Sequence, residues 1–465
     1  MTDLEIVKSL SKDIVENGGR AFLVGGFARD TILRQMGKDV ISKDIDVEVF
    51  GLDMEVLFKL LQNYGTVNTV GKNFGVIKLN NTAIDISIPR RDSKIGVSHK
   101  DFIVNFDPAL TLNEAARRRD FTINSIYIDA ITGDVIDEYN GIPDLREGIL
   151  RVTDPILFAD DPLRVLRAMQ LAGRFNLSLS DTTLALCKKM DLSSLPAERI
   201  GEEWKKLLLK SARPSIGIEV ALSIGVLNKL HPQLAALSTS QTDSKLHPKV
   251  TIWEHAKLAI DEASKIKLRD KLNDEKSLEF MLAVLCHDIG KVSTTRMQNS
   301  SIASYGHEQR GAELTVKFLN QLAMSNYYLD VVPRLVAEHI FPIHNMQLDD
   351  AALRRLAQKL YPATIAQLAR VAEADILGRT SKDKTINHLL HLTERAKSLN
   401  IADDKPSPII YGRDLIPLGI KPGVAMGKVL NNLFEKQLSG DFTEHEEGLL
   451  LAKQLIDEMK DYDLA

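Results

Sequence analysis

Residues 23–30 read LVGGFARD, and residues 43–47 read KDIDV. In the first segment a short apolar strand ends at Gly25 and Gly26, just before an expected helix. Glycines at such a point let the backbone approach a phosphate group, which the amides at the start of the helix can bind. The pattern therefore indicates a phosphate site, to which Arg29 can add a charge-assisted contact. A plain tight turn would also explain the two glycines taken alone.

The second segment places two carboxylates on one face of an expected strand. Successive side chains of a strand point to opposite faces, so Asp44 and Asp46 share a face while Ile45 points the other way, into a core. Two carboxylates on one face suit a pair of hard cations, one activating an attacking hydroxyl and one steadying the leaving oxygen. Asp85, on another expected strand, is a candidate third ligand. A solvated edge strand is the alternative explanation.

Apolar periodicity divides the chain into a mixed first part and a helical remainder. Helical spacing over residues 4–17 is followed by strand-like segments, which together predict a small mixed sheet with helices. The strands are expected at residues 21–24, 45–50, 75–79, 83–88 and 123–129. From about residue 155 only helices are expected, beginning with residues 162–173, 181–190, 198–211 and 217–230. The predicted fold class is therefore α+β, a small mixed-sheet head followed by all-α parts.

Polar stretches indicate the boundaries between these parts. Residues 235–248 are rich in Ser, Thr, Gln, Asp and Lys and poor in apolar residues, which is typical of a linker. A second helical block follows, and the segment from Asp403 to Pro408 separates it from a short helical tail. We therefore expect four parts: a head at 1–145, a helical neck at 146–240, a helical domain at 241–398 and a helical tail at 399–465.

Composition bears on the partners and the compartment. The net charge of −4 argues neither for nor against an RNA partner, which would need a local basic surface such as Arg90–Arg91 or Arg117–Arg119. The two cysteines, Cys187 and Cys286, allow no disulfide framework or zinc knuckle, so a reducing cytoplasm is expected. Residues 1–19 carry charges throughout, and no run approaches the roughly 20 apolar residues of a membrane span. A soluble, cytoplasmic protein is expected.

A second group of potential ligands lies in the later helical block. The sequence CHDIGK includes the adjacent His287 and Asp288. With the distant His255 and Asp375, they can converge on a divalent metal and an activated water. This combination resembles the HD phosphohydrolase superfamily, which implies a divalent transition metal held by these four residues in the part at 241–398. Two further histidines are weaker candidates for the rim of this site or for a second ion: His307 and His339.

Several ordered segments together resemble the class II family of CCA-adding enzymes and bacterial poly(A) polymerases. The two opening segments are followed by RRDFTIN at residues 118–124, YNGIPDL at 139–145 and DDPLRVLRA at 160–168, in the order and spacing of that family. AERI at 197–200 and YGRDL at 411–415 extend the resemblance into the neck and the tail. It implies a template-independent RNA nucleotidyltransferase, with a tRNA CCA-adding enzyme as the most specific interpretation.

The resemblance also implies what the head binds. It implies two Mg²⁺ ions on the catalytic carboxylates Asp44 and Asp46, with CTP and ATP as nucleotides and the tRNA acceptor arm as acceptor. The neck and the tail would hold the tRNA, mainly through phosphates. Arg118, Asp120 and Asn124 would hold the triphosphate or the ribose. The full set of implied nucleotide-binding residues is Gly25, Gly26, Arg29, Arg118, Asp120, Asn124, Asp161, Arg164 and Arg167.

Asp161 and Arg164 lie in the segment that corresponds to the base-reading helix of the family. At positions i and i+3 they are expected on one helix face. A carboxylate accepts from an exocyclic amino group, and a guanidinium donates to ring-nitrogen or carbonyl acceptors. Cytosine and adenine present an amino group beside a ring-nitrogen acceptor, whereas uracil and guanine do not, so this pair can admit CTP and ATP and reject UTP and GTP. A surface ion pair is the alternative.

Two details bear on how closely the chain follows the family. Asp160 stands where the family usually has Glu, one methylene shorter. The loop at about residues 89–112 corresponds to a loop kept by members that add the final A. Within it Arg90, Arg91 and Asp92 are candidate switching charges, and a solvated loop is the alternative.

Three other interpretations are compatible with the sequence. A poly(A) polymerase or an A-adding enzyme shares the head chemistry, but the bacterial poly(A) branch usually lacks an HD domain and has a basic C-terminal extension. Residues 457–461 here read DEMKD, which is acidic. A metal-dependent phosphohydrolase could carry a head that only binds nucleotide. A non-catalytic RNA-binding module is disfavoured, because paired carboxylates repel phosphate unless a metal is bound.

Overall fold

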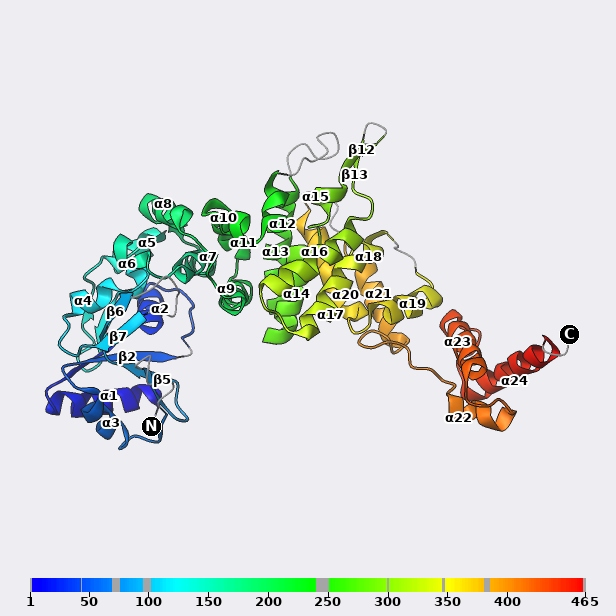
Figure 1. Cartoon of the computed structure of the whole chain (residues 1–465), viewed down its shortest axis with the longest axis horizontal. Coiled ribbons are helices and arrows are strands. Elements are labelled where there is room, and N and C mark those ends of the chain that lie inside the picture. The colour runs from blue at the N-terminus through cyan, green and yellow to red at the C-terminus, as the bar shows by residue number, and fades with distance from the viewer. Residues whose placement is uncertain are drawn as a thin grey trace. The chain divides into compact units, whose positions relative to one another are not determined.

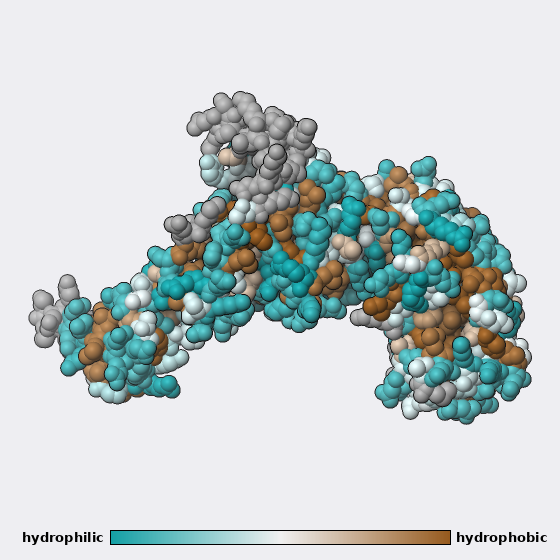
Figure 2. Space-filling model, turned by 180° about the vertical axis from the view of Figure 1, so that it is seen from behind, coloured by the Kyte–Doolittle hydropathy of each residue, from teal (hydrophilic) through white to brown (hydrophobic). Residues whose placement is uncertain are grey.

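The computed structural model describes residues 2–42, 44–68, 76–94, 102–239, 251–298, 301–344, 348–379 and 385–462. The chain divides into two compact units, Met1–Leu230 and His231–Ala465, shown in Figure 1. Among the described helices, none is long and apolar enough to span a membrane. Figure 2 shows hydrophilic side chains spread over much of the visible face. The division into four parts stays a prediction.

A mixed sheet organises the first unit. Its described strands are β1 (Arg20–Leu23), β2 (Ile45–Phe50), β3 (Val67–Asn68), β4 (Val76–Leu79), β5 (Ile84–Ser87), β8 (Tyr127–Asp129) and β9 (Val135–Ile136). They run in the order β3-β4-β5-β2-β1-β8-β9, with β2 and β5 parallel and the other neighbours antiparallel. A separate hairpin pairs β6 (Arg90–Lys94) with β7 (Phe102–Phe106).

Helices pack on this sheet, and the later residues of the unit are mainly helical. They are α1 (Asp3–Glu16), α2 (Gly25–Gln35), α3 (Met54–Leu61), α4 (Leu112–Arg117), α5 (Gly141–Glu147), α6 (Pro155–Phe158), α7 (Leu163–Phe175), α8 (Asp181–Lys189), α9 (Ala197–Lys210), α10 (Pro214–Ser223) and α11 (Val226–Leu230). Val47 and Val49 of β2 share a buried core with Leu10 of α1 and Leu57 of α3. Because strand residues alternate between faces, Asp46 and the residues in step with it lie on the opposite face, away from this core.

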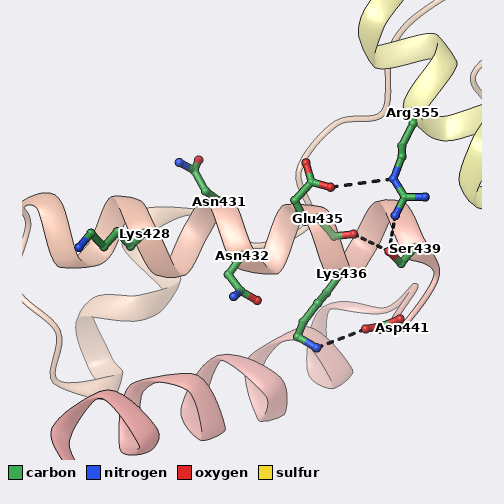
Figure 3. Close-up of a pocket in the computed structure, with 8 residues that line it drawn as sticks. All are labelled: Arg355, Lys428, Asn431, Asn432, Glu435, Lys436, Ser439 and Asp441. Carbon is green, nitrogen blue, oxygen red and sulfur yellow. Dashed lines mark hydrogen bonds and ion pairs between the residues drawn. The ribbon is translucent and has the colours of Figure 1, made fainter. Parts of the chain in front are cut away.

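The second unit is almost entirely helical. Its helices are α12 (Pro232–Ala235), α13 (Ile252–Arg269), α14 (Asp274–Cys286), α15 (Lys291–Thr294), α16 (His307–Gln321), α17 (Asn326–Glu338), α18 (Phe341–His344), α19 (Asp350–Leu360), α20 (Ile365–Gly378), α21 (Asn387–Ser398), α22 (Gly412–Leu415), α23 (Val424–Ser439) and α24 (His445–Tyr462). The last helices dock through α23 onto α19. Arg355 of α19 donates to Ser439 Oγ at 2.7 Å, and Arg354 donates to the Leu438 carbonyl at 3.4 Å. Figure 3 shows Arg355 pointing at this helix.

The predicted α+β class, with the sheet in the head and helices beyond it, is confirmed, and three local predictions were wrong. Residues 123–129 are not one strand, because Thr122–Asn124 form a 3₁₀ turn. The helix expected at 217–230 is interrupted at Gly225, whose positive φ of +80° ends α10. Strands also occur after residue 155: β11 (Ser178–Leu179) pairs with β10 (Ile149–Leu150), and β12 (Arg296–Gln298) pairs with β13 (Ser301–Ala303).

Parts of some predictions lie outside the described residues. They include Lys43, residue 75 of the strand expected at 75–79, residues 240–248 of the expected linker, residues 95–101 of the expected loop, and the side chain of Asp92.

Candidate active sites

A cleft of about 670 Å³ opens in the first unit, lined by residues of α2, β2, α7 and α9 among others. The residues expected to bind metal or nucleotide in the head and neck line it, apart from the candidate third ligand Asp85, although the sequence separates the first from the last by more than a hundred positions. They are Gly25, Gly26, Arg29, Asp44, Asp46, Arg118, Asp120, Asn124, Asp161, Arg164 and Arg167. The structure therefore brings the predicted set together in one place.

The charge of this cleft is opposite to that of the whole chain. Ten cationic side chains line it: Arg29, Arg90, Arg118, Arg119, Arg164, Arg167, Arg174, Arg199, Lys206 and Lys210. Five carboxylates join them: Asp44, Asp46, Glu48, Asp120 and Asp161. A chain with a net charge of −4 thus concentrates positive charge in one hollow, as expected of a site for a polyanion.

The carboxylates on β2 form the negative corner of the cleft. Asp46 lies directly opposite Asp85 in the parallel pairing of β2 with β5, and Asp44 immediately precedes β2. Burial raises the pKa of Asp46 to about 6, and the negative charges of Asp85 and Asp44 add to this, while Arg119 opposes it. Lys78 also pairs with Asp85 at 3.0 Å. A cluster of carboxylates that disfavours its own ionisation fits a divalent cation, which would relieve the repulsion.

Gly25 keeps the backbone close to these carboxylates. Its φ is +60°, which side-chain-bearing residues rarely adopt. A Cβ atom at this position would lie 3.3 Å from Asp46 Oδ2 and 3.3 Å from Arg119 Nη1. The amide of the preceding Val24 donates to the Asp46 carbonyl at 2.9 Å. The glycine therefore leaves room beside the carboxylates, where the sequence predicted a phosphate site.

A buried hydrogen-bond network fixes the inner wall. Arg29 donates to Asp30 Oδ1 at 2.8 and 2.6 Å and to Asn124 Oδ1 at 2.6 Å. Asn124 donates in turn to Asp120 Oδ1 at 2.9 Å, and Arg167 donates to Asp120 Oδ2 at 2.6 Å. Burial would raise the pKa of Asp120, but Arg167 and the Asn124 hydrogen bond lower it below the usual value. Asp120 is therefore a fixed negative charge that orients Arg167.

The two proposed base readers lie in the cleft, but not as one helix face. α7 begins at Leu163, so Asp161 precedes the helix, because Pro162 stands at its N-cap. Asp161 accepts from the Leu163 amide at 3.0 Å and lies 3.7 Å from Arg199 of α9. Arg164 donates at 2.7 Å to the carbonyls of two residues, Leu157 and Arg118. The expectation of an i,i+3 helical pair was wrong, and each side chain is instead held by its own partners.

Several residues of the cleft were not predicted as site residues from the sequence. Glu48 continues the alternation of Asp44 and Asp46 along β2, and Arg174 continues the helical spacing of Arg164 and Arg167. Further charged or amide side chains of this kind are Arg119, Gln170, Arg199, Lys206 and Lys210. Among the loop candidates, Arg90 lines the cleft, whereas Arg91 is held away by Asp107 at 3.0 Å and Glu114 at 3.2 Å.

The four ligands expected in the second unit converge from α13, from the turn that follows α14, and from α20. His255 Nε2, from α13, lies 3.1 Å from His287 Nε2 and 3.2 Å from Asp375 Oδ1 of α20. Asp288 Oδ2 lies 3.4 Å from His287 Nε2 and 3.6 Å from His255 Nε2. Lys291 also pairs with Asp288 Oδ2 at 2.7 Å. This close set of imidazole and carboxylate atoms fits a divalent metal.

Asp288 stands between two groups of potential ligands. One group comprises His255, His287 and Asp288, and the other comprises Asp288, His307 and His339, with the ligand atoms of each within 4.8 Å of one another. Asp288 Oδ1 lies 3.6 Å from His307 Nε2 and 3.9 Å from His339 Nε2. Asp288 Oδ1 and His307 Nε2 are buried without a hydrogen-bond partner in the described part of the chain. Such atoms are expected where a cation belongs.

Backbone carbonyls fix the orientation of three of these histidines through hydrogen bonds to Nδ1. Nδ1 of His287, His307 and His339 lies 2.7 to 2.8 Å from the carbonyl of the residue three positions earlier. A proton on Nδ1 satisfies that carbonyl and leaves the lone pair of Nε2 for a metal. Burial lowers the pKa of His307, and it lowers that of His339 to about 3, so both are neutral at pH 7.

Two glycines allow the helices to approach closely enough to form this site. A Cβ on Gly290, in the CHDIGK segment, would lie 1.9 Å from the His307 carbonyl oxygen. A Cβ on Gly378 would lie 2.7 Å from Cα of Ala259 on α13. The first glycine thus admits the start of α16 beside Asp288, and the second lets α20 carry Asp375 to His255. Both glycines are structural requirements of the ligand cluster.

A further hollow of the second unit lies along α23, at the residues labelled in Figure 3. Its charged groups are largely paired with one another: Arg355 lies 4.0 Å from Glu435, and Lys436 lies 3.4 Å from Asp441. It has neither the excess of positive charge of the head cleft nor a cluster of metal ligands.

Comparisons with known proteins give a family match in each of the two units. A family model described as the poly A polymerase head domain matches residues 21–151, and a model described as the HD domain matches residues 252–378. The multifunctional CCA protein of Xylella fastidiosa (strain M23) is 33% identical over 401 residues, which cover 83% of this chain and 91% of that protein. The multifunctional CCA protein of Mannheimia succiniciproducens is 31% identical over 397 residues, which cover 82% and 90%.

Solved structures share the fold. An apo form of a CCA-adding enzyme gives a TM-score of 0.62 at 21% identity, covering 96% of this chain and 94% of that one. The Thermotoga maritima CCA-adding enzyme complexed with tRNA gives a TM-score of 0.58 at 21% identity, covering 98% of this chain and 95% of that one. The resemblance predicted from the sequence motifs is thus confirmed, and this chain belongs to the family of the multifunctional CCA proteins.

Proposed function

We propose that the first unit adds C, C and A to the 3′ end of tRNA, using CTP and ATP and releasing pyrophosphate. The observation that carries this proposal is one cation-rich cleft that holds both the carboxylates Asp44 and Asp46 and the base readers Asp161 and Arg164. The relatives named multifunctional CCA proteins, matched over most of their length, support it. The chain would meet its tRNA and nucleotide substrates in the cytoplasm.

In this reaction the RNA 3′-hydroxyl attacks the α-phosphorus of the bound nucleotide. Asp44 and Asp46 would hold two Mg²⁺ ions, which supply activation of the hydroxyl and stabilisation of the leaving oxygen. Gly25 and Gly26 leave space for the phosphates beside these carboxylates. Arg118, together with Asp120 and Asn124, holds the triphosphate and ribose, and the excess of cationic side chains offsets the charge that develops on the pyrophosphate.

Base selection falls to Asp161 and Arg164. The Asp161 carboxylate accepts from the amino group of cytosine or adenine, while the Arg164 guanidinium donates to the neighbouring ring nitrogen. The carbonyls of Leu157 and Arg118 fix the plane of this guanidinium, and burial lowers its pKa without removing its charge. Uracil and guanine leave both groups mispaired, so they are rejected.

We expect Asp161→Ala to lower kcat/KM for CTP and ATP by about 10- to 100-fold, because one good polar contact to a base contributes about 1–3 kcal/mol of discrimination. The kcat/KM for UTP should change little, so the preference for CTP and ATP over UTP should fall. Addition of each nucleotide, tested separately on a tRNA that lacks its 3′ end, measures this. Asp181→Ala, at an exposed aspartate on α8, is the control. Equal losses for all four nucleotides would show that Asp161 does not read the base.

For the second unit, we propose a metal-dependent phosphohydrolase site. His255, His287, Asp288 and Asp375 would hold a divalent transition metal, for which imidazole and carboxylate ligands are suited. His307 and His339, which share Asp288, would hold a second ion. An activated water at such a site attacks a phosphate ester.

The neck and the tail would hold the tRNA acceptor arm through its phosphates, so tRNA binding should weaken as the salt concentration rises.

A further inference from the structure

Glu48 is a buried carboxylate beside the proposed metal ligands. It follows Asp44 and Asp46 in the alternation of β2, yet its relative exposure is 0%. Arg118 Nη2 lies 2.6 Å from Oε1, and Arg119 Nη2 lies 3.0 Å from Oε2. The Tyr127 hydroxyl donates to Oε2 at 3.3 Å. With both oxygens occupied by donors, Glu48 is not available as a third metal ligand.

The charge of Glu48 is retained because of its two arginines. Arg118 lies 2.6 Å from one of its oxygens and Arg119 lies 3.0 Å from the other, and opposite charges at these distances favour the ionised carboxylate. The triad of Arg118, Glu48 and Arg119 therefore carries a net positive charge. Burying three charges costs free energy unless they are well paired with one another. The Glu48 carboxylate therefore fixes the positions of both guanidiniums.

Both guanidiniums border the space that a triphosphate must occupy. Arg118 and Arg119 line the cleft, and Nε of each has no partner within the described part of the chain. Arg119 Nη1 and Asp46 Oδ2 both lie 3.3 Å from the point where a Cβ of Gly25 would stand. One guanidinium thus reaches the glycine turn and the metal carboxylates together. A planar guanidinium in a fixed orientation suits phosphate oxygens.

Arg118 is also held through its backbone. Its carbonyl accepts a hydrogen bond from Arg164 Nη2 at 2.7 Å. Arg118 therefore contacts both the buried carboxylate of Glu48 and a base reader. Without Glu48 the two guanidiniums would be free to lie against Asp46, since Arg119 Nη1 and Asp46 Oδ2 already border the same point beside Gly25. Glu48 therefore holds them at a set distance from the metal ligands.

We propose that Glu48 is a positioning residue that orients Arg118 and Arg119 toward the β- and γ-phosphates of the incoming nucleotide. This inference rests on the proposed nucleotidyl transfer and adds a residue to it. The phosphates are common to CTP and ATP, so Glu48 acts equally on both, unlike the base readers.

Glu48→Gln tests this proposal, since it keeps the shape of the side chain and removes its charge. The affinities for CTP, ATP and CMP are measured by equilibrium dialysis without tRNA. We expect the affinities for CTP and ATP to fall by the same factor, about 10- to 100-fold, as for loss of charge-assisted hydrogen bonds. The affinity for CMP, which lacks the β- and γ-phosphates, should change little. In steady-state addition, KM should rise more than kcat falls.

Glu373→Gln is the matched control. Glu373 is a buried glutamate of the second unit that Arg269 contacts at 2.5 and 3.0 Å, so the substitution breaks a similar ion pair away from the cleft. It should leave CTP binding unchanged. Equal losses for CTP and CMP in Glu48→Gln, or no loss for CTP, would overturn the proposal.

Arg118→Lys keeps the proposal testable if Glu48→Gln does not fold. The lysine retains a charge beside Glu48 but loses the planar fork, so CTP affinity should fall while CMP affinity is kept. An unchanged CTP affinity in this variant would contradict the proposal. Because binding is measured without tRNA, the two failures can be told apart: a wild-type protein that binds CTP but adds no nucleotide would overturn the proposed function, whereas an unchanged CTP affinity in the variants would overturn only the role of Glu48.

Discussion

Replacing Asp44 and Asp46 by asparagine should lower kcat/KM for CTP and ATP addition by about a thousandfold or more. The two carboxylates are the proposed ligands of the catalytic ions, and such ions supply several kcal/mol of transition-state stabilisation, with each 1.36 kcal/mol worth about tenfold in rate. Asparagine retains the size of the side chain but removes the charge that a hard cation requires. Single-turnover addition to a tRNA without its 3′ end measures the loss.

The fold should survive these substitutions. The pKa of Asp46 is raised to about 6, above the unfolded value of 3.8, so its ionised form opposes folding at neutral pH. Asp46→Asn should therefore leave the melting temperature of the metal-free protein unchanged or higher. Asp181→Asn serves as the control for charge alone. Retention of full activity by the double variant would exclude Asp44 and Asp46 as the catalytic metal ligands.

His287→Ala and Asp288→Ala should abolish metal-dependent phosphodiester hydrolysis and leave nucleotide addition intact. Asp288 belongs to both groups of potential ligands, whereas His339 belongs to only one. The loss of Asp288 should therefore remove more of the bound metal than the loss of His339. We expect a fall in hydrolysis of about a thousandfold or more, on the scale of a lost metal ion. Hydrolysis of bis(p-nitrophenyl) phosphate with added Mn²⁺, Co²⁺ or Ni²⁺ measures this, and elemental analysis of the purified protein measures the metal.

The comparison with the variants of the first unit separates the two sites. Asp44→Asn/Asp46→Asn should retain hydrolysis, whereas His287→Ala should retain addition. His391→Ala, at an exposed histidine of α21, is a control for the loss of an imidazole. A His287→Ala protein that keeps both its metal and its hydrolytic activity would contradict the assignment of the second site.

The sequence could predict those parts of the fold in which periodicity and chemistry coincide. The alternation around Asp44 and Asp46 correctly placed a strand with one polar face, and the helical spacing of α1, α8 and α9 was correct to within two residues at each end. Two-residue strands such as β10 and β11 show no periodicity and were missed. The helix α7 was also placed to within two residues at each end, but Asp161 lies before it, because Pro162 stands at its N-cap.

The candidate sites show a similar limit. The motifs predicted which chemical groups would meet, but not which partners hold them. Arg29 is satisfied by Asp30 and Asn124, a contact that only the fold reveals. Glu48 follows the same alternation as its neighbours, yet its role depends on two arginines about 70 positions later. Long-range ion pairs of this kind leave no local signal in one sequence.

The most direct test of the account is the sequence of products formed on a tRNA that lacks its 3′ end. Wild-type protein is incubated with Mg²⁺ and with CTP and ATP together, and the extended ends are sequenced. The account predicts addition of C, C and A in that order, followed by a stop. A long A tract would indicate a poly(A) polymerase, and addition of A only to ends that already carry CC would indicate an A-adding enzyme. Either of these results, or no incorporation at all, would contradict the account.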